Sequence, residues 1–83
     1  MFEIAKRNKN EKAFGNWDTF PNGRRIYWFE LKGKRGWSAK YLKEVDNFEE
    51  TIRFWQEIFN EKNELVEIHE KYPVDKGHIK IIK

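Results

Sequence analysis

The chain has 83 residues, a net charge of +3 and no cysteine, which indicates one small soluble domain and excludes disulfides, zinc–thiolate sites and a cysteine nucleophile. No apolar run approaches the roughly 18 residues of a membrane span, and the short apolar start is followed by charge, unlike a signal peptide. We therefore expect a cytoplasmic protein with no membrane contact, in which four Trp, three Tyr and seven Phe supply much of the core.

The first 23 residues are rich in polar and turn-forming side chains. Residues 8–12 (NKNEK) and 15–23 (GNWDTFPNG) predict loops. Pro21-Asn22-Gly23 is typical of a turn, because Pro presets φ and Asn-Gly tolerates positive φ. The sequence pattern does not predict where this segment packs on the rest of the domain.

Residues 24–45 predict a β-hairpin. Two runs with alternating apolar side chains, 24–32 and 37–45, flank a loop bounded by Gly33 and Gly36. Alternation places Tyr27 on one face of the first strand and Trp28 on the other.

Residues 46–72 allow two interpretations. The first is a helix over about residues 47–59, which would make the domain α+β. Its apolar stripe would consist of Phe48, Ile52, Trp55 and Phe59. The favoured interpretation is a hairpin of strands 51–59 and 64–72, because aromatic and β-branched residues dominate both arms. Asn60 and Asn63 suit the two ends of the intervening turn.

The hairpin interpretation also predicts a register. A three-residue loop with a bulge at Asn63 sets Ile58 opposite Val66 and Trp55 opposite His69. It also places two like-charged pairs opposite each other, which destabilises a sheet by a few tenths of a kcal/mol. These pairs are Glu57 with Glu67 and Arg53 with Lys71.

The expected fold is therefore mainly β. We predict an antiparallel meander of about four strands (24–32, 37–45, 51–59 and 64–72) within a single domain spanning residues 1–83. Pro73 ends the last long strand, and residues 74–77 turn the chain into HIKIIK, a short terminal strand.

The run FWQEIFNEKNELVEIHEKYPVDKGH, residues 54–78, resembles a segment of small stand-alone prokaryotic proteins of unassigned function. It covers about a third of the chain. Such segments usually have Gly in the turn where this chain has Asn63. The resemblance implies no activity, cofactor or functional residue.

The segment KGKRGWSAK, residues 32–40, has four cations and one Trp in and beside a Gly-bounded loop. Mobile cations suit phosphate contacts, and an exposed aromatic ring suits stacking with single-stranded bases. A non-enzymatic module that binds single-stranded nucleic acid is the most specific function that these residues support. The predicted contacts are Lys32, Lys34, Arg35, Trp37, Lys40, Arg24 and Arg25.

Both histidines lie in EIHEKYPVDKGH, residues 67–78. Histidine titrates near neutral pH, so a metal-independent, ribonuclease-like activity of His69 and His78 with Asp75 is an alternative function. It requires the terminal strand to fold back. No metal-ligand spacing is present, and we expect neither a metal nor a cofactor.

A third interpretation is that the protein associates with itself or with a partner and catalyses no reaction. Trp28, Trp55 and Phe59 fall on what would be second faces of their strands. A single covering layer hides only one face of a sheet, and exposed apolar patches commonly mark interfaces. A homo-oligomer that uses this aromatic face therefore remains an alternative.

Overall fold

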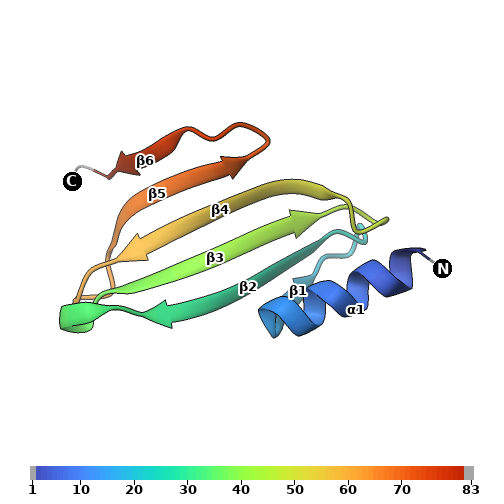
Figure 1. The fold of residues 1–83 in the computed structure, drawn as a ribbon, viewed down its shortest axis with the longest axis horizontal. Coiled ribbons are helices and arrows are strands. Elements are labelled where there is room, and N and C mark those ends of the chain that lie inside the picture. Colours follow the sequence, from blue (N-terminus) through green and yellow to red (C-terminus); the bar gives the residue numbers. More distant parts are fainter. Residues whose placement is uncertain (1, 82–83) are drawn as a thin grey trace.

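A computed structural model describes the backbone of residues 2–81 and the side chains of residues 4–81. One helix, one short 3-10 turn and six strands make up this part of the chain (Figure 1). The elements are α1 (Phe2–Phe14), β1 (Asn16–Thr19), β2 (Arg25–Lys32), η1 (Lys34–Gly36), β3 (Ser38–Val45), β4 (Thr51–Phe59), β5 (Leu65–Tyr72) and β6 (Gly77–Lys80). None of them is a helix long and apolar enough to span a membrane.

The strands form one antiparallel sheet in the order β1-β2-β3-β4-β5-β6, so the predicted meander is confirmed. Its four long strands match the expected ranges to within one residue. The helical alternative for residues 47–59 is wrong, because residues 51–59 form β4 between two neighbouring strands. Residues 8–12 do not form the expected loop but belong to α1, and part of the expected loop 15–23 forms β1.

The helix lies across one side of the sheet near β1 and β2 (Figure 1). We call this side the helix face; on β2–β4 it carries Tyr27, Phe29, Tyr41, Lys43 and Phe54. Phe14, at the end of α1, packs against three of these rings, with centroid distances of 5.5–6.4 Å. The fully buried residues Tyr27 and Val45 mark the core on this side.

The other side, the open face, carries a row of Trp28, Leu42 and Trp55 across β2, β3 and β4. No described helix crosses it, yet Leu42 and Trp55 are buried. Charged side chains of the same face lie over the two indole rings that flank Leu42. Lys40 lies 4.4 Å from the Trp28 centroid and Arg53 lies 4.2 Å from that of Trp55.

The register of β4 and β5 differs from the predicted one. Phe59 pairs with Leu65 as expected, but Trp55 lies opposite Glu70 and Gln56 opposite His69. The pairing shifts at two extra residues of β5, Val66 and Lys71, and each shift of one residue moves the following side chains to the opposite face. Tyr72 and His69 therefore share the helix face although they are three residues apart.

The shifted register has two consequences. It moves His69 to the helix face and avoids the like-charged pairs that the predicted register required. Arg53 instead binds Glu70 on the neighbouring strand through two hydrogen bonds, of 2.6 and 2.8 Å. Hydrogen bonding to Arg53 also lowers the pKa of Glu70.

Two strand connections share one turn geometry. In residues 46–50 the side chain of Asp46 accepts hydrogen bonds from the backbone N–H groups of Phe48 and Glu50. In residues 60–64 the side chain of Asn60 accepts the equivalent bonds from Lys62 and Glu64. The fourth residue of each turn, Glu49 or Asn63, has a φ of 62°. Asn adopts this left-handed conformation readily, whereas Glu does so rarely.

Candidate functional site

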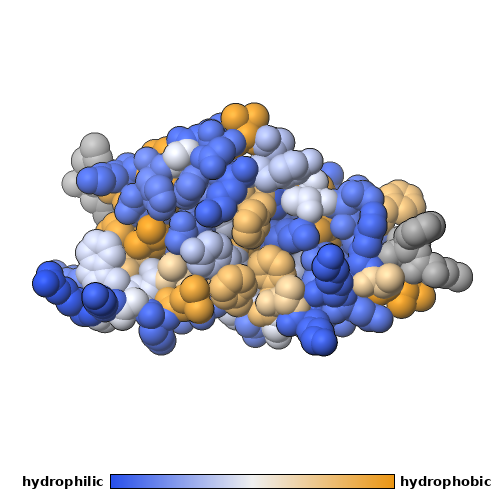
Figure 2. Space-filling view, in the orientation of Figure 1, coloured by the Kyte–Doolittle hydropathy of each residue, from blue (hydrophilic) through white to orange (hydrophobic). Residues whose placement is uncertain are grey.

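A groove runs between α1 and strands β3–β5 on the helix face. It consists of a hollow of about 440 Å³ joined to one of about 240 Å³. Lys43, Glu50 and Thr51 line both. The larger hollow is also lined by Phe14, Phe54 and Tyr72, and the smaller by Lys6, Lys9, Asn10 and Glu49. Figure 2 shows apolar side chains gathered in the middle of this face, between hydrophilic surfaces.

Aromatic rings form the floor of the groove. Phe54 meets Phe14 edge to face, with 6.4 Å between the ring centroids. Tyr72 lies opposite Phe54 in the sheet and is 47% exposed. Beyond them Phe29 and Tyr41 stack at 5.0 Å. The floor thus offers flat apolar surface to a ligand.

Lys43 lies where the two hollows meet. Its Nζ donates a hydrogen bond of 2.9 Å to Oδ1 of Asn10. Burial lowers the pKa of Lys43, and the charge of Lys9 lowers it further, while the charge of Glu49 acts in the opposite direction. Its ammonium group is therefore poorly hydrated, and an anionic ligand would supply a partner.

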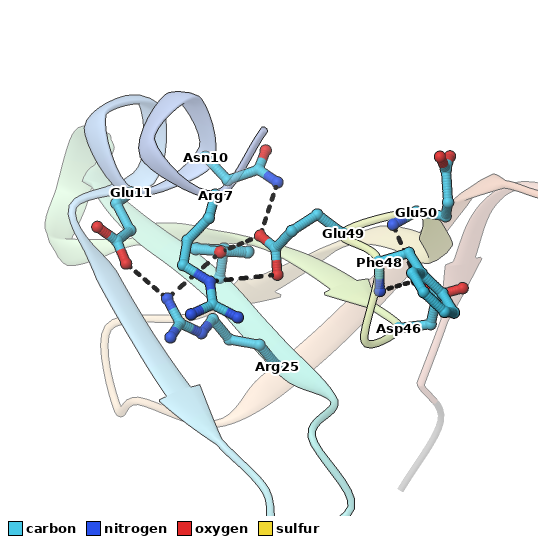
Figure 3. Close-up of polar contacts among 9 residues, drawn as sticks. Arg7, Asn10, Glu11, Arg25, Asp46, Phe48, Glu49 and Glu50 are labelled. Carbon is cyan, nitrogen blue, oxygen red and sulfur yellow. Dashed lines mark hydrogen bonds and ion pairs between the residues drawn. The ribbon is translucent and has the colours of Figure 1, made fainter. Parts of the chain in front are cut away.

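A buried carboxylate fixes the helical wall of the groove (Figure 3). The side chain of Glu49 is 1% exposed. It accepts hydrogen bonds from the Tyr27 hydroxyl and from Nδ2 of Asn10, the latter at 3.5 Å, and Nε of Arg7 lies 3.9 Å away. Since Asn10 and Arg7 belong to α1, Glu49 ties the helix to the sheet.

A second ion pair supports this contact. Arg25 of β2 donates a hydrogen bond of 2.6 Å to Glu11 of α1 and lies 3.4 Å from the Tyr27 hydroxyl. Burial, together with the hydrogen bond to Glu49, raises the pKa of Tyr27 to about 12. Buried charges of this kind are stable only when each has partners, as these do.

Of the residues predicted to contact nucleic acid, Arg25 is separated from the others by α1. Arg25 is buried under α1 with Glu11, while Arg24, its neighbour in sequence, pairs with Glu44 at 3.6 Å. Lys40 covers Trp28 on the open face. Arg25 thus lies on the helix face, whereas Lys40 and Glu44, the partner of Arg24, lie on the open face.

The remaining four residues gather around the β2–β3 connection, which we call the tip (residues 32–37). Lys34 and Arg35 are exposed in η1, and Lys32 lies 3.7 Å from Glu30. Trp37 is 39% exposed, and its indole donates a hydrogen bond of 2.8 Å to Glu61 in the neighbouring turn. The tip thus keeps two cations and a partly exposed ring, next to carboxylates.

The two histidines come together, as the ribonuclease-like alternative requires. β6 folds back on β5 and places His78 opposite His69, with ring centroids 4.3 Å apart. Asp75 lies 2.7 Å from Nε2 of His69, and Glu67 lies 3.2 Å from Nδ1 of His78. Among the described residues, no group of three or more acidic or histidine side chains is arranged to hold a metal ion.

Sequence patterns missed the groove for identifiable reasons. Its helical wall, FEIAKRNKNEKAF, has too few apolar residues to show a helical stripe. Lys43 looked like an ordinary strand lysine, although its strand neighbour is the buried Tyr27. The segments DNFEE (residues 46–50) and NEKNE (residues 60–64) are similar in sequence. This similarity indicates two turns of one kind, with Glu49 at the left-handed position that Asn63 occupies.

No family model matches the chain, and neither the curated proteins nor the solved structures contain a match. The resemblance of residues 54–78 to small prokaryotic proteins stays a prediction.

Proposed function

We propose that the protein is a binding module for single-stranded nucleic acid, and that the groove, not the tip, is its main contact. The observation that carries this proposal is the combination of an aromatic floor with a lysine rim in one hollow of the helix face. Proteins that bind single strands combine these same two features.

The floor supplies stacking surface. Phe54 and the half-exposed Tyr72 line the larger hollow side by side. Stacking of a base on an aromatic ring contributes about 1–3 kcal/mol and tolerates any base. The hollow has the size of a small-molecule site, so we expect it to take one or two bases of a strand.

The rim supplies positive charge. Lys6, Lys9 and Lys43 line the groove together with two carboxylates. Of these, Glu49 is turned toward Tyr27 and Asn10, and Glu50 is paired with Lys6. The charge left facing the groove is positive, which suits phosphate groups.

The test is the anisotropy of a labelled oligonucleotide of about eight nucleotides, as RNA and as DNA, titrated at about 50 and 200 mM salt. The groove variant Lys9→Gln/Lys43→Gln is compared with the tip variant Lys34→Gln/Arg35→Gln, which removes the same charge. We expect the groove variant to bind at least about tenfold more weakly. The slope of the logarithm of the binding constant against the logarithm of the salt concentration should become shallower by about 1.4.

The control decides between the two surfaces. If the tip variant loses binding and the groove variant keeps it, the tip residues Lys34, Arg35 and Trp37 are the site. If neither variant changes a measurable affinity, the proposal for the groove is wrong. Elution as a 10.2 kDa monomer in the same buffer would also decide against self-association through the open face.

A further inference from the structure

We propose that His78 is the general base of a metal-independent RNA cleavage, acting on a strand that lies in the groove and continues over β5 and β6. This inference rests on the proposed function. The geometry that carries it is the paired arrangement of two histidines and two carboxylates on the helix face of the β5–β6 hairpin.

The two histidines differ in which nitrogen is available. Nδ1 of His78 lies 3.2 Å from Glu67, and the ring is 44% exposed. A carboxylate at Nδ1 favours the tautomer with its proton there and leaves Nε2 as a base. In His69, Nε2 is engaged with Asp75 and Nδ1 is buried without a partner in the described structure.

These differences assign separate roles. His78 is the residue that reaches a substrate, and Glu67 is a positioning residue that orients its ring. His69 packs beside His78 with 4.3 Å between the ring centroids and is fixed by Asp75. It therefore also acts as a positioning residue.

The hairpin continues the surface of the groove. Tyr72, at the groove, and His69 lie on the same strand, three residues or roughly 10 Å apart. Between them Lys71 places its Nζ 5.7 Å from the ring centroid of Tyr41 on the helix face. A strand stacked at Tyr72 can follow this lysine to His78.

The chemistry is an internal transesterification. His78 Nε2 takes the proton of a ribose 2′-hydroxyl, the 2′-oxygen bonds to the adjacent phosphorus, and the bond from phosphorus to the 5′-oxygen breaks. Water protonates the leaving 5′-oxygen, and the imidazolium neutralises the hydroxide that forms. The products are a 2′,3′-cyclic phosphate and a 5′-hydroxyl, with no change in oxidation state.

Positive charge is available for the phosphate oxygens. Lys80 lies opposite Glu67 in the register and on the same face as His78. Lys71 approaches from β5. Cationic groups placed near developing negative charge stabilise a transition state of this kind.

The experiment follows cleavage of an end-labelled RNA by gel in the presence of EDTA, for the wild type, His78→Gln and Glu67→Gln. We expect products ending in cyclic phosphate, at least about a 100-fold loss of rate in His78→Gln, and a smaller loss with a displaced pH–rate profile in Glu67→Gln. Binding of a 2′-O-methyl RNA, which cannot react, is measured in parallel, so that a loss of binding is separated from a loss of cleavage rate.

The outcomes separate this inference from the proposed function. Binding of 2′-O-methyl RNA without cleavage of RNA by the wild type would overturn the inference and leave the proposed function intact. Cleavage that persists in His78→Gln, or that EDTA abolishes, would also overturn it. Absence of binding to either RNA would remove the proposed function itself.

Discussion

The two turns at residues 46–50 and 60–64 have the same hydrogen bonds and the same left-handed fourth residue, but they differ in what that residue does. Asn63 lies in an exposed connection between β4 and β5, and Asn suits a φ of 62°. Glu49 has the same φ, yet its side chain is buried beneath α1.

A left-handed residue other than Gly or Asn is strained by roughly 1–2 kcal/mol. Glu49 is stable in this conformation because its carboxylate meets Tyr27, Asn10 and Arg7. The first turn is therefore an anchor for α1, whereas the second only connects two strands. Because α1 forms one wall of the groove, the anchor also shapes the candidate site.

The largest effect should come from Glu49→Asn, which suits the backbone better but removes the carboxylate from its partners. Leaving buried donors and Arg7 without this group should destabilise the protein by about 2–4 kcal/mol. Urea unfolding followed by tryptophan fluorescence measures this difference. A neutral or stabilising result would mean that backbone strain outweighs the anchor.

The reverse exchange at the second turn should have a smaller effect. Asn63→Glu places a poorly suited residue at φ 62° without new partners, so we expect a loss of about 1 kcal/mol. Asn63→Gly serves as the control and should stay within about 0.5 kcal/mol of the wild type. Equal losses in both variants would show that the Asn63 side chain, not its backbone, matters.

The anchor should also be visible in an alkaline titration. The pKa of Tyr27 is raised to about 12, so its contribution to stability is complete below the ordinary tyrosine pKa of about 10 and is lost as the pH rises through 12. Absorbance at 295 nm should show one late-titrating tyrosine that is missing in Tyr27→Phe. Its pKa should fall in Glu49→Gln, and no change there would contradict the link between the two side chains.

The smallest effects should come from the exposed glutamates that end the two turns. Glu50 pairs with Lys6 at the surface, and Glu64 accepts a hydrogen bond from Asn60. Glu50→Gln and Glu64→Gln should each change stability by less than about 0.5 kcal/mol. A large loss in Glu50→Gln alone would extend the anchor beyond Glu49.

The strands were predictable from sequence because alternation and β-branched or aromatic residues act locally. The ends of β2 to β5 were placed to within one residue on that basis. The register of β4 and β5 was not, since a single extra residue at Val66 moves His69 from one face to the other. The local alternation of apolar and polar residues does not predict such a bulge.

The candidate site was less predictable than the sheet. Histidines and tip cations could be named from their residue types, but their neighbours depend on contacts distant in sequence. Arg25 illustrates this, because α1 buries it against Glu11 and removes it from the predicted surface. Lys43 and Tyr72 meet only once the sheet and helix are assembled.

Whether the groove binds RNA is decided by the anisotropy titration of labelled single-stranded RNA with the groove variant Lys9→Gln/Lys43→Gln and the tip variant Lys34→Gln/Arg35→Gln. We predict salt-dependent binding by the wild type, at least about a tenfold loss in the groove variant, and less than about a twofold change in the tip variant. Equal affinity of the wild type and the groove variant would contradict the assignment of the groove as the binding site.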